Sequence, residues 1–576
     1  MAAPFPRRHF LSSAVAAGVG FCSAQSWAKP HVEESWFIRA HVNQVGYLPD
    51  EPKRTVVTTT EPLTSPTFHV VEEKTAVVRY AGELTPVHHA KSRAQDWIAD
   101  FSVFRRPGRY RIRLAGGTLS PPFGIGAAIY ADLFPMMESY FGIQQCGPQS
   151  SPLRKPCHLD DGIIRGGPRD GQPFDATGGW HDAGDYLKFV ETTSYAVALL
   201  LLACDLHPQL VTDRAGTSPL SPLLIQAKVG LDWLLKMHPT PHEFYYQVGD
   251  KNDHNRWRLP ENDSKEALKS WHVRPVFFGI GANLAGRTTA AFAMASRRYK
   301  RADPAFAARC LSAAQTVFAL GLKHPHPIST EPHEFYPEDS GDDDMEWGAA
   351  ELYRATRNPY YLRKALAFAE EVDVAAEHAS VYTTNALAHF ALYPHVTGED
   401  RATLLGYLQS DADRMRRQMH GAYGLATPYV WGTAEAATGV ALTCLLYAKL
   451  SGDKSAADVA RRQRDYILGC NPFGLSCLIG VGARFPQSPH HQIAALDKFQ
   501  LNGGMIAGPT SLEVFEQQDF HAKNLEYSVP FKQVSSRDSA EVGVYQDSAR
   551  NFVTNEPAID YTAQFLLLST LYLPTK

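Results

Sequence analysis

The alternation of apolar and polar positions changes once along the chain, near residue 128. Between residues 37 and 126, short extended runs follow one another, separated by clusters of Pro, Gly, Asp and Ser. Strands at this spacing are typical of a small all-β sandwich. The runs that carry the pattern are FIRAHVNQVGYL, KRTVVTT, TFHVVEE, AVVRYAG, DWIADFSVF and GRYRIRL.

From residue 129 to the end at 576, apolar residues recur at intervals of three and four, which predicts helices. Several segments, such as SYAVALLLLACDLH and TAEAATGVALTCLLYAKLSG, are apolar on nearly every face. Connections as long as those between the helices usually build a site. The pattern predicts a ring of paired helices with the long loops on one face. These loops are residues 144–186, 240–285, 325–345 and 470–556.

The first 28 residues differ in composition from the rest. Arg7 and Arg8 precede a short stretch rich in Ala, Gly and Ser, and Ser26 and Ala28 place small residues at the positions that a signal peptidase reads. The stretch is too short to span a bilayer, and the pattern resembles a twin-arginine export signal. We expect cleavage near Ala28 and a periplasmic or secreted bacterial protein without a membrane anchor; a basic tail is the alternative.

Charge and cysteine content narrow the class of protein. The chain has 56 Lys and Arg against 60 Asp and Glu, with no long run of either sign, so we expect no nucleic-acid partner. Cleavage of the signal would leave seven of the 8 cysteines, and an odd number is a poor disulfide framework. Cys204 and Cys444 lie in apolar helical runs and are expected to be buried free thiols. A monomer is the default expectation.

The segment GGWHDAGDY, residues 178–186, places two carboxylates three positions apart. Held this close, Asp182 and Asp185 repel each other, which suits a site where crowded carboxylates share a proton or hold one water molecule. A solvated polar turn explains the same residues. The segment alone leaves both interpretations open.

Two cysteines and two histidines accompany this segment. Four such ligands are what a closed, tetrahedral structural zinc site requires. Isolated cysteines are also common as buried thiols, so spacing alone leaves two interpretations. The four residues are Cys146, Cys157, His158 and His181.

Three segments resemble, in order and spacing, the catalytic segments of glycoside hydrolase family 9, the inverting cellulases: GGWHDAGDYLKF, NPFGLSCLIGVGARFPQSPHH and YQDSARNFVTNEPAIDY. The opening VNQVGYLPDEPKRTVV is similar to the immunoglobulin-like module of one branch of that family. The resemblance implies an immunoglobulin-like β-sandwich over residues 37–126. It implies an all-α (α/α)6 barrel of twelve helices over residues 129–576, and an endoglucanase that cleaves β-1,4-linked glucan.

The resemblance also implies roles for single residues. Asp185 would activate water with help from Asp182, and Glu556 would protonate the leaving oxygen, for which its pKa must be raised. His490 and Asp547 would line the cleft beside the cleaved bond. The residues expected to bind the sugar chain are Trp180, Tyr186, His491, Trp431 and Tyr545.

Metal sites follow from the same resemblance. The branch with the immunoglobulin-like module carries zinc at the positions of Cys146, Cys157, His158 and His181, which favours structural zinc here. The acidic run EDSGDDDMEW, residues 338–347, is a candidate calcium site through Asp343 and Asp344, because hard cations bind clustered oxygens. A solvated acidic loop explains this run equally well.

Two departures from the family pattern keep other substrates open. Gln492 stands where the family usually has arginine, and Thr562 where it commonly has asparagine. Losing a guanidinium removes a bidentate donor from the sugar subsites. These departures, with no recognisable cellulose-binding module, motivate an exo-acting hydrolase of short β-1,4 oligosaccharides, of the cellobiohydrolase or exo-glucosaminidase type. A non-catalytic carbohydrate-binding protein is a third interpretation. The presence of all three carboxylates argues against it.

Overall fold

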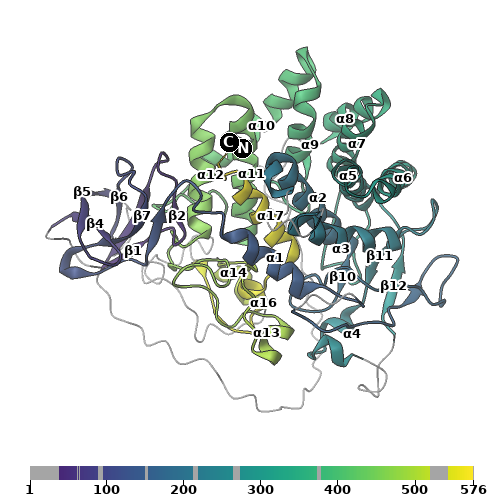
Figure 1. Cartoon of the computed structure of the whole chain (residues 1–576), viewed down its shortest axis with the longest axis horizontal. Coiled ribbons are helices and arrows are strands. Elements are labelled where there is room, and N and C mark those ends of the chain that lie inside the picture. Colours follow the sequence, from purple (N-terminus) through teal and green to yellow (C-terminus); the bar gives the residue numbers. More distant parts are fainter. Residues whose placement is uncertain are drawn as a thin grey trace.

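The computed structural model describes residues 38–574, except 61–62, 64, 88–94, 149–152, 212–217, 219, 264–272, 373–377 and 519–542. The strands of the first domain gather at the left of the molecule, and the helices, with a few short strands among them, occupy the rest (Figure 1). The last strand of the first domain ends at Ile125, and the first helix begins at Leu133. The expected export signal, residues 1–28, lies outside the described residues.

The N-terminal domain is a β-sandwich, which confirms the alternating pattern. Its strands pair in the order β1-β3-β6-β5-β4-β7-β8-β2. The first half of β5 pairs with β4 and its second half with β6, so this strand belongs to both layers. Phe68, Ile112 and Phe123 are among the side chains that fill the core. The strands are β1 (Ile38–His41), β2 (Gly46–Tyr47), β3 (Arg54–Thr59), β4 (Thr67–Glu72), β5 (Val78–Val87), β6 (Gln95–Asp100), β7 (Gly108–Arg113) and β8 (Phe123–Ile125).

The second domain is a double ring of helices, which confirms the (α/α)6 barrel. The inner helices contact one another in a closed circle, in the order α2, α5, α7, α9, α11, α17 and back to α2. The inner ring is α2 (Val190–Leu206), α5 (Ala282–Arg298), α7 (Asp342–Thr356), α9 (Asn385–Leu392), α11 (Thr433–Ser451) and α17 (Ile559–Thr570). The outer ring is α1 (Leu133–Gln144), α3 (Pro222–Met237), α6 (Pro304–Lys323), α8 (Pro359–Glu371), α10 (Gly398–Gln418) and α12 (Lys454–Ile467).

Inner helices are buried on nearly every face, and most outer helices bury a single apolar stripe. Every residue of α2 from Val190 to Cys204 is buried, whereas α10 buries only a stripe that includes Leu404, Leu408 and Met415. Three outer helices begin with a capping side chain followed by proline, at Ser221, Asp303 and Asn358. Among the described residues, α6 alone has the length and composition of a membrane span, and 50% of its apolar window is buried in the protein.

The long connections contain short elements that the sequence pattern did not predict, because runs of two to six residues carry no readable period. A four-stranded sheet joins parts of the 144–186 and 240–285 connections in the order β10-β11-β12-β9. The elements are β9 (Ile163–Arg165), β10 (Lys188–Phe189), β11 (Tyr245–Val248), α4 (Lys251–His254), β12 (Pro275–Phe278), α13 (Gln492–Asp497), β13 (Thr510–Ser511), α14 (Leu512–Gln517), β14 (Gly543–Val544) and α16 (Phe552–Asn555).

Polar side chains fasten the sandwich to the barrel. Asn43, just after β1, donates from Nδ2 to Asp465 Oδ1 at 2.8 Å. Its own Oδ1 accepts from the backbone N–H groups of Val45 and Gly46. Gln44 Oε1 accepts from two backbone N–H groups of the barrel, those of residues 483 and 484. Because these groups are largely buried, an unpaired partner would be costly.

We expect Asn43→Ala to lower the free energy of unfolding by about 1–3 kcal/mol, because it removes the hydrogen bond to Asp465 and leaves the backbone N–H groups of Val45 and Gly46 without their side-chain acceptor. Urea denaturation would measure the change. The control is Arg105→Ala, which removes an exposed ion pair to Asp50 and should alter stability by less than about 0.5 kcal/mol. Equal stability of both variants would contradict the fastening role of Asn43.

Candidate active site

The turn at residues 178–186 lies between α1 and α2 and is pinned to the start of α17. The backbone N–H of Asp182 donates to the Leu187 carbonyl at 2.9 Å, and the Asp182 carbonyl accepts from Ile559 N–H at 3.0 Å. The Gly184 carbonyl accepts from Gln492 N–H at 2.8 Å. Three segments far apart in sequence therefore meet at one turn.

Asp182 is buried and held by two hydroxyl groups. Thr192 Oγ1 donates to its Oδ1, and the Tyr336 hydroxyl donates to its Oδ2 at 2.6 Å. Burial raises the pKa of Asp182 to about 7, and the charge of Asp185 adds to the rise, while the two hydroxyl donors oppose it. This carboxyl group is consequently fixed in orientation and resists ionisation.

Asp185 lies in a different environment. Its Oδ1 accepts from Leu187 N–H at 3.0 Å, and its Oδ2 accepts from Nδ1 of His254, at the end of α4. Burial works to raise the pKa of Asp185, but the hydrogen bond and positive charge of His254 outweigh it and hold the pKa below its ordinary value. The same pairing raises the pKa of His254 to about 9 against the effect of burial. Asp185 is therefore the ionised member of the pair.

Glu556 faces the same turn from just before α17. Its Oε1 accepts from Gly184 N–H at 3.0 Å. Burial, followed by repulsion from Asp185, raises the pKa of Glu556 to about 8. A Cβ on Gly184 would lie 2.8 Å from this Oε1 and 2.3 Å from the His490 carbonyl oxygen, so only glycine allows the close approach.

The other two residues implied in the reaction lie in the same region. His490 Nδ1 donates to the Ala549 carbonyl at 2.7 Å, and burial lowers the pKa of His490 to about 4, so its ring is neutral. Asp547 accepts from the backbone N–H groups of Gln487 and Ser488, both at 2.8 Å. In this structure Asp547 shapes the 487–490 segment. Its predicted place in the cleft stays a prediction.

Burial corrects four of the five expected sugar contacts. Trp431 is 37% exposed and packs against Phe552, with the two rings tilted relative to each other. The other four side chains are buried, and several are engaged inside the protein, so they support the site from behind: Trp180, Tyr186, His491 and Tyr545. Aromatic residues near catalytic carboxylates suggest sugar binding from sequence, but sequence does not reveal which ring faces inward.

Three neighbours of the carboxylates were missed by the sequence analysis: Thr192, His254 and Tyr336. The first lies on α2 within reach of the turn, but the other two come from separate connections. A lone His in KNDHNRW and a Tyr in EFYPED carry no spacing signal. Only the folded chain brings them to the turn.

The two departures from the family pattern are both internal. Gln492 is 1% exposed, and its Oε1 accepts from Arg258 N–H at 3.1 Å. Thr562 is fully buried on α17, where its Oγ1 accepts from Met505 N–H and donates to the Ala558 carbonyl. Both side chains are therefore buried and bonded within the protein.

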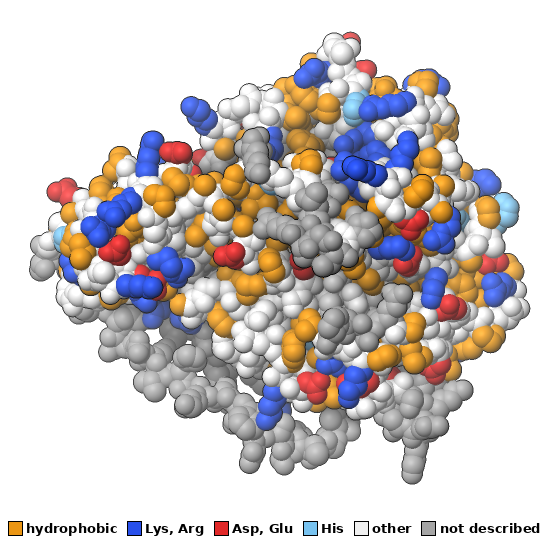
Figure 2. Space-filling view, in the orientation of Figure 1, with side chains coloured by type: hydrophobic (Ala, Val, Ile, Leu, Met, Phe, Trp, Pro, Cys, Tyr) orange, Lys and Arg blue, Asp and Glu red, His pale blue; other side chains and the backbone are white. Residues whose placement is uncertain are grey.

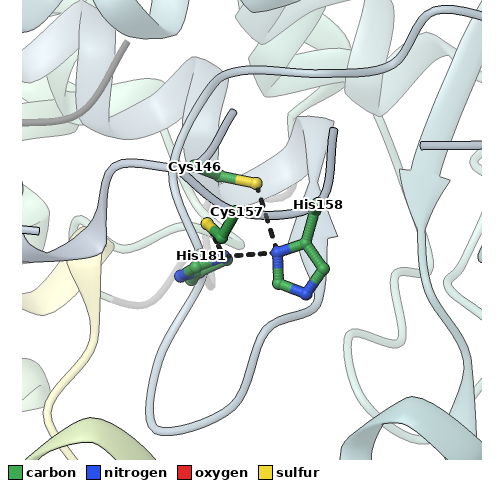
Figure 3. A group of neighbouring side chains, drawn as sticks. All are labelled: Cys146, Cys157, His158 and His181. Atoms are coloured by element: carbon green, nitrogen blue, oxygen red, sulfur yellow. Dashed lines mark hydrogen bonds between the residues drawn. The ribbon is translucent and has the colours of Figure 1, made fainter. Parts of the chain in front are cut away.

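The four predicted metal ligands converge in one buried cluster beside the turn (Figure 3). Their ligand atoms all lie within 4.8 Å of one another. Cys146 Sγ is 3.6 Å from His158 Nδ1, Cys157 Sγ is 3.9 Å from His181 Nε2, and the two histidine nitrogens are 3.3 Å apart. Tetrahedral coordination with ordinary zinc bond lengths gives separations of about 3.3–3.8 Å, so small shifts of these side chains would complete the geometry. The cluster can therefore bind a metal ion.

A second layer of contacts orients the cluster. His158 Nε2 lies 2.9 Å from Asp263 Oδ2, and Arg258 pairs with the same carboxylate. This leaves His158 Nδ1 available as the ligand, since a carboxylate on one ring nitrogen fixes the other for metal. His181 directly precedes Asp182, so the cluster and the carboxylate share one stretch of backbone.

The candidate calcium residues are used differently. Asp343 and Asp344 begin α7, where Asp343 Oδ2 accepts from Thr384 N–H at 2.6 Å and Asp344 Oδ1 lies 3.3 Å from Arg287 Nε. Both are buried, so this is no solvated loop. Among the described residues, only the Cys and His cluster gathers three or more candidate ligand atoms.

Cys204 and Cys444 are free and buried, as predicted. The thiols of inner-ring helices thus have no role in the site.

Comparison with known proteins places the chain in a family. Residues 130–569 match Glycosyl hydrolase family 9, and residues 38–118 match the Cellulase N-terminal ig-like domain. Endoglucanase D of Acetivibrio thermocellus is 25% identical over 488 residues, covering 80% of this chain and 75% of the relative. Endoglucanase A of Bacillus pumilus is 26% identical, covering 80% and 69%.

Solved structures agree over nearly the whole chain. A metagenome-derived glycoside hydrolase family 9 endoglucanase matches with a TM-score of 0.78 at 26% identity, covering 93% of this chain and 99% of that one. A Zn-binding triple mutant of the family 9 endoglucanase J30 matches with a TM-score of 0.76 at 27% identity, covering 92% and 100%. Because the family model covers most of the chain and an Ig-like domain precedes it, the chain belongs to glycosyl hydrolase family 9.

Proposed function

We propose that the protein is an endoglucanase that hydrolyses β-1,4-glucan with inversion, Asp185 acting as base and Glu556 as acid. The observation that carries the assignment is the opposite direction of the two pKa shifts at one turn. Carboxyl groups whose pKa values are driven apart take the two roles of acid–base catalysis. The relatives named above, which are endoglucanases, support the substrate class.

The reaction follows from these protonation states. Asp185 accepts a proton from a water molecule, and the water oxygen attacks the anomeric carbon from the face opposite the leaving group. Glu556 gives its proton to the glycosidic oxygen as that bond breaks. Asp182, locked by its two hydroxyl donors, supplies a second fixed acceptor for the same water. Exchange with solvent returns Asp185 and Glu556 to their starting states.

The exo-acting alternative rests on Gln492, Thr562 and the lack of a recognisable cellulose-binding module. Of these, the two side chains give it no support, because both are hydrogen-bonded within the described part of the protein. Endo action is therefore the better supported proposal.

We propose zinc as the metal of the Cys and His cluster. Two thiolates and two imidazoles in a tetrahedral arrangement suit zinc, and such a closed site is structural. A Zn-binding triple mutant of a family 9 endoglucanase matches this fold. Bound there, zinc would supply no chemistry beyond cross-linking the loop that carries Asp182 and Asp185.

We also propose export through the signal at residues 1–28, on the strength of Arg7 and Arg8 and the apolar stretch after them.

Removing the acid should abolish most hydrolysis. We expect Glu556→Gln to lower kcat on a soluble β-1,4-glucan by about 10²–10⁴-fold, because the leaving oxygen loses its proton donor. Proton NMR of the fresh wild-type products should show the α-anomer. Glu399→Gln, on the exposed start of α10, is the control and should match the wild type. Full activity of the Glu556 variant, or β-anomeric products, would refute the assignment.

The pH profile should follow the same two groups. As pH rises through about 8, Glu556 loses its proton and kcat/KM should fall. On the acid side, activity should persist down to the depressed pKa of Asp185, because the base must be ionised. Initial rates across the pH range, with stability checked at each pH, would test this. An alkaline limb that begins near pH 5 would be inconsistent with Glu556 as the acid.

Metal removal should loosen the loop. We expect Cys157→Ser to eliminate zinc measured by mass spectrometry, to lower the Tm and to reduce kcat, because the 146–181 cross-link is lost. Cys310→Ala is the matched control: this thiol is buried but lies outside the cluster, so zinc content should not change. Wild-type protein that holds no zinc after growth in zinc-supplemented medium would overturn the metal assignment.

A further inference from the structure

One buried arginine, Arg287 on α5, lies among acidic side chains and has no direct part in the proposed reaction. It is fully buried within the inner ring. The carboxyl groups near it come from α2, α7 and the connection before α7, and are Glu191, Glu338, Asp343 and Asp344. Three of them lie within ion-pair distance of the guanidinium. A buried cation with so many partners calls for an explanation.

The guanidinium reaches three separate parts of the chain. Its Nη2 donates to Glu338 Oε1, its Nη1 donates to the Val381 carbonyl, and its Nε lies 3.3 Å from Asp344 Oδ1. Lysine could not replace it, because a single ammonium lacks the planar fork that addresses several acceptors at once. Arg287 thus joins an inner helix to two loops.

The first of these loops, residues 325–341, leads directly to a catalytic carboxyl group. Tyr336 stands two residues before Glu338, with Pro337 between them restricting the backbone. The Tyr336 hydroxyl holds Asp182 Oδ2 at 2.6 Å. Fixing Glu338 therefore fixes the backbone that carries the Asp182 donor.

The second loop, residues 378–384, contacts both Arg287 and the start of α7. Its Val381 carbonyl is bound by Arg287, and Thr384 N–H donates to Asp343. The ring centroids of Tyr336 and Tyr382 are 6.3 Å apart, so the two loops also touch through aromatic side chains.

We propose that Arg287 is a positioning residue for hydrolysis: it ties the 325–341 loop to the 378–384 segment and thereby fixes Tyr336 on Asp182. This inference rests on the proposed function, because it assigns Arg287 to the same reaction. It also explains the acidic run at 338–347 without calcium, since the guanidinium serves as the internal cation there.

The charges around Arg287 determine how the test must be designed. Burial raises the pKa of Glu338 to about 7, and it also raises the pKa values of Glu191, Asp343 and Asp344. Removing the guanidinium alone leaves this acidic pocket without its cation, which destabilises the fold whatever the role of Arg287. A second variant must therefore remove a negative partner as well.

The experiment compares Arg287→Met, the double variant Arg287→Met with Glu338→Gln, and Arg297→Met. Arg297 is the matched control, because it lies on the same helix and pairs with Asp205 and Glu351, away from both loops. Tm, kcat and KM on a soluble β-1,4-glucan are measured for each, at a temperature where all variants are folded.

We expect Arg287→Met to lower both Tm and kcat. The double variant should recover most of the Tm, yet its kcat should stay about 10–100-fold below the wild type with KM little changed, because Asp182 remains misplaced. Arg297→Met should lower Tm without changing kcat. A double variant that regains wild-type kcat, or a control that loses as much kcat as Arg287→Met, would overturn the inference. A wild type that leaves the glucan intact would instead reject the proposed function, and this inference with it.

Discussion

The active site depends on one backbone contact, the hydrogen bond from Ile559 N–H to the carbonyl of Asp182. This bond joins the turn that carries two of the acids to the helix that follows the third. Gly184 extends the junction by donating to Glu556 and accepting from Gln492. Because main-chain groups make the junction, the separation of Asp185 and Glu556 is set by the fold before any substrate arrives, which is what the proposed acid and base roles require.

The pKa values of Asp182 and Asp185, which lie on the same turn, shift in opposite directions because the neighbours of the two carboxyl groups differ. Asp185 faces a histidine and accepts charge-assisted hydrogen bonding, whereas Asp182 faces hydroxyl groups and the barrel interior. The surface of the protein shows basic and acidic side chains interspersed, without one dominant sign on the visible face (Figure 2). The electrostatic environment of the two carboxyl groups is therefore set by the few side chains that contact the turn, not by the charge of the protein surface.

Much of the architecture could be predicted from the sequence, because helix and strand periods report burial directly. The four metal ligands could also be identified, since thiols and imidazoles close to one another in sequence share a loop. His254, Tyr336 and Arg287 could not be identified, because each acts through contacts between distant connections. The expected sugar contacts failed at Trp180 and Tyr186 for a related reason: an apolar ring near a catalytic turn can face either the cleft or the core, and here both are buried.

The inner ring closes only when α17 packs between α2 and α11. That helix is formed by residues 559–570, almost the last of the chain, whereas α2 begins at Val190. A nascent chain still lacking these residues exposes apolar faces of two helices and has no Glu556 beside its turn. The barrel therefore closes only through a contact between segments more than 350 residues apart in sequence, so its folding depends on long-range packing rather than on neighbouring helices alone.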